Sequence, residues 1–214
     1  MIRLLFFVFA LASIAAPVRA QYRPPNEEGE EQEVDVQGTR RGSCVARDAF
    51  PELMVPERIA LTISSEPKLL LRFPVALEVP VLVVLSDRAG NIFDRQSLVS
   101  KQGYVLVESS PQQALPEGNY YWTVIIKCRP QLAFNPYGRV EFKRVNPSSS
   151  SIRSIPKSFE FNQINDMDQI RLLAQQGIWY DAIALAYEGG MQSKPIFWGL
   201  LDDAGLEINY HNSF

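Results

Sequence analysis

Seven short apolar segments, separated by turn residues, follow residue 58 and predict β-strands. In residues 59–63, large apolar side chains recur at every second position, as in a strand with one buried face. The other six segments are 69–73, 79–85, 92–98, 104–107, 120–128 and 140–145. Their length and spacing predict a mainly β domain over residues 41–146, an antiparallel β-sandwich that is Ig-like in architecture.

A turn and one long strand give the clearest pairing signals in this domain. Residues 87–91 form a turn sequence in which Gly90 is placed for a positive φ, so we expect the flanking segments to pair as a hairpin. In residues 120–128, the side chains that share one face are Tyr120, Trp122, Val124, Ile126 and Cys128. We therefore expect Cys128 to point toward the core.

The hydrophobic pattern changes to a helical period after the sandwich. A serine-rich stretch with Pro147 indicates a linker over residues 147–160, and a helical appendage follows over residues 161–214. Three short helices are expected, with boundaries set by Asn165, Gly177, Gly189 with Gly190, Ser193 with Pro195, and Gly205. Because helices this short are marginal alone, we expect them to pack on the sandwich.

Two segments precede the sandwich. Residues 1–20 place Arg3 before an apolar run and end in Val18-Arg19-Ala20, which is typical of a secretory signal peptide. The apolar run is shorter than the roughly 20 residues of a membrane-spanning helix, so no membrane insertion is expected after cleavage. Residues 21–40 are rich in glutamate and predict a disordered acidic leader. The mature protein is expected to be periplasmic or secreted.

Cys44 and Cys128 are the two cysteines of the chain. Both follow the predicted signal peptide, and an oxidising compartment allows a disulfide to form and persist. We therefore predict a Cys44–Cys128 disulfide, with two buried free thiols as the alternative.

Charge and residue counts argue against several classes of function. The formal charge of −3 includes Arg3 and Arg19, so the mature chain carries about −5, and its basic residues are scattered. This pattern argues against nucleic-acid binding. The single histidine, His211, lies close to the C-terminus, which argues against catalytic triads and zinc sites. Without a phosphate-binding or dinucleotide glycine motif, we expect no cofactor, no metal and no catalytic residue.

Carboxylates beside aromatic residues leave one kind of enzymatic chemistry open. Two acids held about 5–9.5 Å apart can cleave a glycosidic bond without histidine or metal. The candidate acids are Asp181, Glu188, Asp202 and Asp203. Tyr180 precedes Asp181, so this pair forms a speculative carbohydrate site. The alternative is structural, because a carboxylate in the first turn of a helix interacts favourably with the helix dipole.

Three tryptophans lie in patterned apolar segments. They are Trp122, Trp179 and Trp198. We interpret them as structural aromatics, and we expect Trp179 and Trp198 to pack the helices onto the sheet.

Four stretches of the mature chain carry a family resemblance. They are Arg41-Gly42-Ser43-Cys44, Leu115-Pro116-Glu117-Gly118-Asn119-Tyr120-Tyr121-Trp122 leading to Cys128, Gly177-Ile178-Trp179-Tyr180-Asp181-Ala182, and Trp198-Gly199-Leu200-Leu201 with Gly205-Leu206. Together they resemble the bacterial domain-of-unknown-function family numbered 928, known mostly from photosynthetic prokaryotes. The resemblance implies an exported protein with no assigned activity.

These observations favour an exported, non-enzymatic binding or interaction module whose partner is an envelope protein. We expect its binding surface on the helices or on the loops at one end of the sandwich. One alternative is a carbohydrate-binding or carbohydrate-cleaving protein that uses acids near Asp181. A second alternative is a structural component of the cell envelope.

Overall fold

Nine strands form two sheets in the computed structural model, within its described residues 21–25, 34–37, 44–128, 135–147 and 166–206. The strands are β1 (Asp35–Gln37), β2 (Glu52–Leu53), β3 (Ala60–Thr62), β4 (Lys68–Phe73), β5 (Val81–Asp87), β6 (Ile92–Leu98), β7 (Gly103–Glu108), β8 (Gly118–Ile126) and β9 (Tyr137–Arg144). A 3-10 helix, Arg47–Ala49, precedes β2. The seven predicted strands are confirmed as β3 to β9, and β1 and β2 are additional.

The larger sheet has the order β1-β9-β8-β5-β6, and the smaller sheet has the order β2-β4-β7. The predicted hairpin joins β5 and β6, with Gly90 at a φ of 88°. The pairing of β3 differs from the all-antiparallel expectation, because β3 runs parallel to β9. β1 and β3 share one edge of β9, where β1 pairs with residues 137–139 and β3 pairs with residues 142–144.

Three helices follow the sandwich: α1 (Asp166–Gln175), α2 (Trp179–Glu188) and α3 (Gly190–Asp203). The predicted start of α3 at Ser193 and Pro195 is wrong. α3 begins at Gly190, directly after α2, which leaves Pro195 inside the helix. Ser193 does not cap the helix, because its hydroxyl donates a hydrogen bond of 2.6 Å to the carbonyl oxygen of Ala186. This bond ties α3 back to α2. The predicted linker, beyond residue 147, and Asn165 lie outside the described residues.

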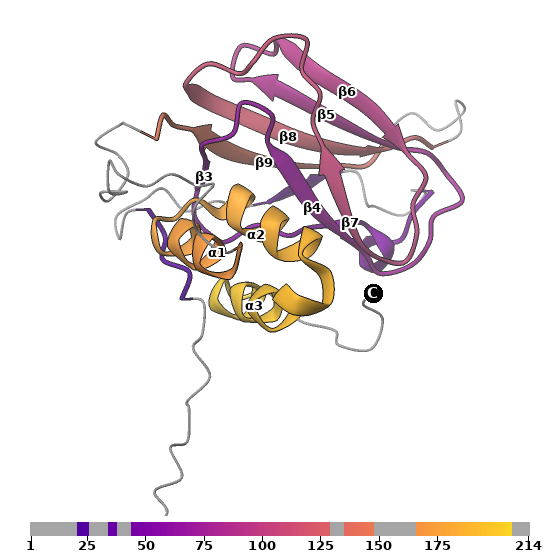
Figure 1. The fold of residues 1–214 in the computed structure, drawn as a ribbon. Coiled ribbons are helices and arrows are strands. Elements are labelled where there is room, and N and C mark those ends of the chain that lie inside the picture. The colour runs from indigo at the N-terminus through magenta and orange to yellow at the C-terminus, as the bar shows by residue number, and fades with distance from the viewer. Residues whose placement is uncertain (1–20, 26–33, 38–43, 129–134, 148–165, 207–214) are drawn as a thin grey trace, which may run out of the picture.

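The smaller sheet lies between the larger sheet and the helices (Figure 1). Its central strand, β4, is buried on both faces, as the three consecutive leucines Leu69 to Leu71 show. On the helix side, the Tyr104 ring of β7 contacts the Phe197 ring of α3 at 5.4 Å. The molecule is therefore mainly β, with antiparallel sheets and three C-terminal helices packed on one side.

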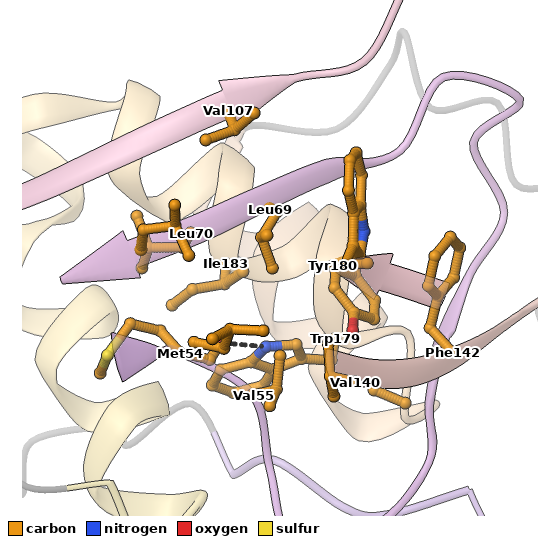
Figure 2. Packing of buried hydrophobic residues seen from close by; sticks show 14 of the residues in the cluster. Met54, Val55, Leu69, Leu70, Val107, Val140, Phe142, Trp179, Tyr180 and Ile183 are labelled. Atoms are coloured by element: carbon orange, nitrogen blue, oxygen red, sulfur yellow. Dashed lines mark hydrogen bonds between the residues drawn. The ribbon is translucent and has the colours of Figure 1, made fainter. Parts of the chain in front are cut away.

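The start of α2 connects the helices to both sheets (Figure 2). Trp179 is fully buried, and its Nε1 donates a hydrogen bond of 3.0 Å to the carbonyl oxygen of Met54, just after β2. The next residue, Tyr180, places its ring 5.1 Å from the Phe142 ring of β9. Trp122 is buried on β8, and Trp198 is half-buried against Tyr104. Two consecutive α2 side chains thus reach the smaller and the larger sheet.

Residues 21–25 pack on the helices, which differs from the predicted disordered leader over residues 21–40. Tyr22 is only 6% exposed, and its ring lies 5.0 Å from the Trp179 ring. Its backbone N–H donates to the Asp203 carboxylate at 3.1 Å. Residues 21–25 therefore form part of the fold through Tyr22, and residues 34–37 do so through the pairing of β1 with β9. The rest of the predicted leader, and the predicted signal peptide, lie outside the described residues.

The predicted disulfide is confirmed between Cys44 and Cys128, whose Cα atoms are 5.7 Å apart. Its expected position in the core is confirmed for Cys128, which is 9% exposed and belongs to the core cluster. β8 ends at Ile126, so Cys128 lies beyond the sheet, and Cys44 is exposed. The disulfide thus joins the exposed Cys44 to the buried Cys128, two residues beyond the end of β8. A disulfide is consistent with export. No helix among the described residues is long and apolar enough to span a membrane.

Candidate functional site

A groove of about 490 Å³ opens between the turn that joins β3 to β4 and the helices α1 and α2. We call it the α2 groove. Its volume lies within the range of small-ligand sites. It is lined by Thr62, Ile63, Ser64, Ser65, Glu66 and Lys68 of the strand side, and by Gln169, Leu173, Tyr180, Asp181, Ala184, Leu185 and Glu188 of the helices. The lining combines an apolar floor with hydroxyl, amide and carboxylate groups.

Helical periodicity explains the helix wall of the groove. One face of α2 carries Asp181, then Ala184 and Leu185, then Glu188, because these positions follow one another at intervals of three or four residues. Gln169 and Leu173 are similarly spaced on α1. The two carboxylates of α2 are seven residues apart, which is about 10 Å along the helix axis. One helix face therefore presents an acid at each end of the groove.

The opposite wall is the β3–β4 turn, which is held by hydrogen bonds between residues that are close in sequence. The backbone N–H of Ser64 donates to the Thr62 hydroxyl at 3.1 Å, and the N–H of Glu66 donates to the Ser64 hydroxyl at 3.0 Å. The turn is also bonded to α2, because the N–H of Ile63 donates to the Asp181 carboxylate at 3.2 Å. These bonds fix the backbone while leaving the Glu66 side chain exposed to solvent.

Asp181 is the carboxylate of the groove whose pKa is shifted most clearly. Burial raises its pKa from 3.8 to about 6, although hydrogen bonds from the Thr62 side chain and from backbone N–H groups oppose this rise. The carboxylate is half-buried and faces the groove lining. It is therefore ionised at neutral pH and takes up a proton in mildly acidic solution.

Lys68 is already neutralised by two glutamates. Its ammonium group pairs with Glu188 of α2 and lies 3.0 Å from the Glu108 carboxylate of β7. Burial lowers the pKa of Lys68, but the hydrogen bonds and charges of both glutamates outweigh it and raise the pKa above its ordinary value. Because Lys68 is the one cation among the described residues of the lining, these residues keep an excess of negative charge from Asp181 and Glu66.

The structure brings together only part of the predicted acid set. Asp181 and Glu188 line the α2 groove. Asp203 instead accepts a hydrogen bond from the backbone N–H of Tyr22, and Asp202 is exposed on α3 outside the groove. Tyr180 borders the groove, but it is 1% exposed, and its hydroxyl has no hydrogen-bond partner among the described residues. Its ring face is therefore not available for stacking on a sugar. His211 lies outside the described residues.

Sequence reasoning missed the strand side of the groove. Residues 64–67 carry a turn signal, and Lys68 begins a strand, but neither has a spacing typical of a binding motif. Glu66 and Lys68 become site residues only because α2 packs beside the turn. The sequence signal that could have indicated this site was the polar face of the second predicted helix, which carries Asp181 and Glu188.

A family model described as Domain of Unknown Function (DUF928) matches residues 36–195. This match spans the sandwich and the first two helices. No curated protein sequence matches the chain.

Several solved structures are distantly similar to the chain. FLGD from P. aeruginosa is 17% identical, with 42% of this chain and 76% of that chain covered, at a TM-score of 0.30. The C-terminal domain of wzt is 14% identical, with 66% and 92% covered, at a TM-score of 0.29. An arabinose-bound α-L-arabinofuranosidase, MgGH51, is 15% identical, with 62% and 24% covered, at a TM-score of 0.28. Scores this low support no conclusion about this chain.

Proposed function

The chain belongs to the DUF928 family, which has no assigned activity, and from its α2 groove we propose an exported, non-enzymatic binding module. Its ligand is a protein of the cell envelope that inserts a basic side chain into the groove. Support comes from one observation: the groove has carboxylates on both walls, and its single lysine is already paired with two of the chain's own glutamates. A lysine or arginine of a partner would meet the excess negative charge of Asp181 and Glu66 there.

The same geometry argues against catalysis by the groove acids. Glu188 is engaged by Lys68, and Asp181 accepts a hydrogen bond from the Ile63 backbone. Their backbone positions are about 10 Å apart along α2, which exceeds the separation of about 5–9.5 Å between the two carboxylates of a glycosidase. Both carboxylates are therefore better placed to bind a cation than to act as an acid–base pair.

A carbohydrate ligand remains the second candidate, favoured by one feature. The raised pKa of Asp181, about 6, is what a general acid near neutral pH requires. The buried rings of Trp179 and Tyr180 offer no stacking surface, which weighs against a carbohydrate ligand.

A structural role in the envelope is the third candidate. An Ig-like relationship of the sandwich is supported by the Tyr120 hydroxyl, which donates to the Pro116 carbonyl oxygen at 2.8 Å, as in a tyrosine corner.

Peptide binding tests the proposal. We expect fluorescein-labelled peptides that carry lysine or arginine to bind the mature chain at pH 7, and the glutamate versions of the same peptides not to bind. Glu66→Lys should weaken binding roughly tenfold or more, because it places a cation at the mouth of the groove. Glu78→Lys is the matched control, since Glu78 is exposed on the β4–β5 loop and outside the groove lining. Equal loss in both variants, or equal binding of acidic peptides, would overturn the proposal.

A further inference from the structure

The larger sheet has a second face, turned away from the core. We call it the outer face and define it by the strand alternation: it carries Leu82, Val84 and Ser86 of β5 with Tyr121, Thr123 and Ile125 of β8. The helices and the smaller sheet lie on the other side of this sheet (Figure 1). Leu82 and Val84 are 8% exposed but lie outside the main core cluster. The outer face thus has an apolar centre that is separate from the core.

Cations slightly outnumber carboxylates around this centre, although the chain as a whole is acidic. Among the described residues that the strand register assigns to this face or its turn, four are cations, Arg88, Arg95, Arg139 and Lys143, and three are carboxylates, Asp35, Asp87 and Glu141. Arg88 pairs with Glu141 at 2.6 Å. Within the described part of the chain, neither Arg95 nor Arg139 forms an ion pair with a carboxylate.

Arg95 and Arg139 occupy one row across the sheet. In the register, Arg95 lies opposite Val84, Val84 opposite Thr123, and Thr123 opposite Arg139. Three strand spacings separate the two arginines, which is about 14 Å. Both side chains are exposed, and the residues between them in the row, Val84 and Thr123, are buried. The two guanidinium groups therefore flank a strip of small and apolar side chains.

The Arg139 guanidinium is held in place before any ligand arrives. Its Nε donates to the Thr123 hydroxyl at 3.1 Å, and its central carbon lies 5.0 Å from the centre of the Tyr121 ring. The Tyr121 hydroxyl is fixed in turn by a hydrogen bond of 3.2 Å to Glu141. A stacked guanidinium bonded through Nε keeps its two terminal nitrogens for a bidentate contact with a carboxylate. Pre-orientation lowers the entropy lost on binding.

We propose that the outer face binds an acidic polysaccharide. The carboxylates of uronic acid residues would contact Arg95 and Arg139, while the apolar side of a sugar ring would lie on the half-buried Ile125. The hydroxyl of Ser97, which is exposed, lies on the same face for a hydrogen bond to the sugar. A sheet face several strands wide suits an extended polymer. This site is separate from the α2 groove and does not depend on its function.

Affinity electrophoresis with polygalacturonate tests this proposal, with dextran as the neutral polymer and poly-L-glutamate as the acidic polypeptide. We expect the mature chain to be retarded by polygalacturonate and not by dextran. The double variant Arg95→Gln/Arg139→Gln should weaken the retardation roughly tenfold or more. Arg139→Lys should lose part of the affinity, because lysine keeps the positive charge but cannot make a bidentate contact with a carboxylate.

The matched control is Lys101→Gln/Arg47→Gln, which removes two exposed cations that lie off the outer face. Its retardation should stay within about twofold of the parent if the outer face is the site. Thermal melts of all variants establish that each one is folded. The proposal is overturned if both double variants lose affinity equally, if dextran binds as well as polygalacturonate, or if poly-L-glutamate binds as tightly.

Discussion

Asp181 combines a structural contact with a position at the α2 groove. Its carboxylate accepts the Ile63 N–H and so bonds α2 to the β3–β4 turn. Because burial raises its pKa from 3.8 to about 6, the folded chain binds a proton between about pH 4 and pH 6 that the unfolded chain releases. The contribution of this group to the free energy of unfolding is therefore largest below about pH 4. It falls as the pH rises through about 6 and is constant above that.

Thermal melts of the parent and of Asp181→Asn at several pH values measure this linkage. We expect the melting temperature of the variant, relative to the parent, to increase from pH 4 to pH 7, because asparagine does not carry the buried charge. The change from a carboxylate to an amide alters the hydrogen bond to Ile63 at every pH, so only the pH dependence of the difference is diagnostic. A constant difference across this range would contradict the raised pKa.

Trp179 is the residue whose loss should destabilise the fold most. Trp179→Ala leaves a cavity beside Met54 and removes the hydrogen bond to its carbonyl oxygen, so we expect a loss of about 3–5 kcal/mol in the free energy of unfolding, measured by urea denaturation. Trp198→Ala is the comparison, since that ring is half-buried, and its loss should be clearly smaller. A Trp179→Ala variant with an unchanged midpoint would refute the role assigned to this side chain.

At this scale, the sequence predicts which side chains are buried better than it predicts what they contact. Helical spacing places Asp181 in a first turn and Trp179 on an apolar face, and both positions are as expected. Their partners, Ile63 and Met54, are more than 100 residues away in the chain. Periodicity reports the buried face of an element but carries no information on the element that packs against it.

Among the elements, the segment before β1 depends on the turn between α1 and α2. Gly177 has a φ of 76°, and a Cβ at this position would lie 2.8 Å from the backbone nitrogen of Pro25. The N–H of Arg23 also donates to the carbonyl oxygen of Ala174 at 3.1 Å. The close approach of residues 21–25 therefore requires glycine at this turn.

Hydrogen exchange of Gly177→Ala tests this dependence. We expect the Arg23 amide to lose its protection, together with about 1–3 kcal/mol of stability from the steric conflict. Gly205→Ala is the matched control, because Gly205 has a similar φ of 72° but open space at its Cβ position. Gly205→Ala should show only the backbone strain of roughly 1–2 kcal/mol and keep Arg23 protected. Retained protection of Arg23 in Gly177→Ala would show that the segment packs elsewhere.

The disulfide closes a loop of 84 residues around most of the sandwich. Its removal in Cys44→Ser/Cys128→Ser should lower the free energy of unfolding by about 4 kcal/mol, because the unfolded chain regains the entropy of the open loop. Urea denaturation of the parent with and without reductant should reproduce the difference. If the double variant unfolds at the same urea concentration as the oxidised parent, the disulfide does not stabilise the fold.

Elements with strict periodicity were predictable, and elements defined by tertiary contacts were not. β3 and β8 follow an alternation of apolar residues, β4 and β5 are continuous apolar runs, and α2 follows a clear helical stripe. The pairing of β3 parallel to β9 and the two-residue strand β2 have no local signal, since both arise when distant segments meet. Local rules also misplaced the start of α3, because Ser193 bonds back to α2 instead of capping.

For the whole molecule, the layer order places two different surfaces on one chain. The helices cover the smaller sheet and create the acidic α2 groove, whereas the outer face of the larger sheet stays uncovered by the described residues and carries arginines. The predicted location of a binding surface on the helices or end loops matches the position of the groove; its use in binding stays a prediction. The outer face had no signal in composition, because its cations are scattered in sequence and gather only through strand pairing.

Site-specific photocrosslinking in the envelope of the producing organism tests the central claim most directly. Benzoylphenylalanine placed at Ser65, in the groove lining, should crosslink one reproducible envelope protein. The same group at Val99, which is 88% exposed and outside the groove, should not crosslink that protein. Adding Glu66→Lys to the Ser65 probe should abolish the product. A product that persists with Glu66→Lys, or that forms equally from Val99, would contradict a partner-binding role for the α2 groove.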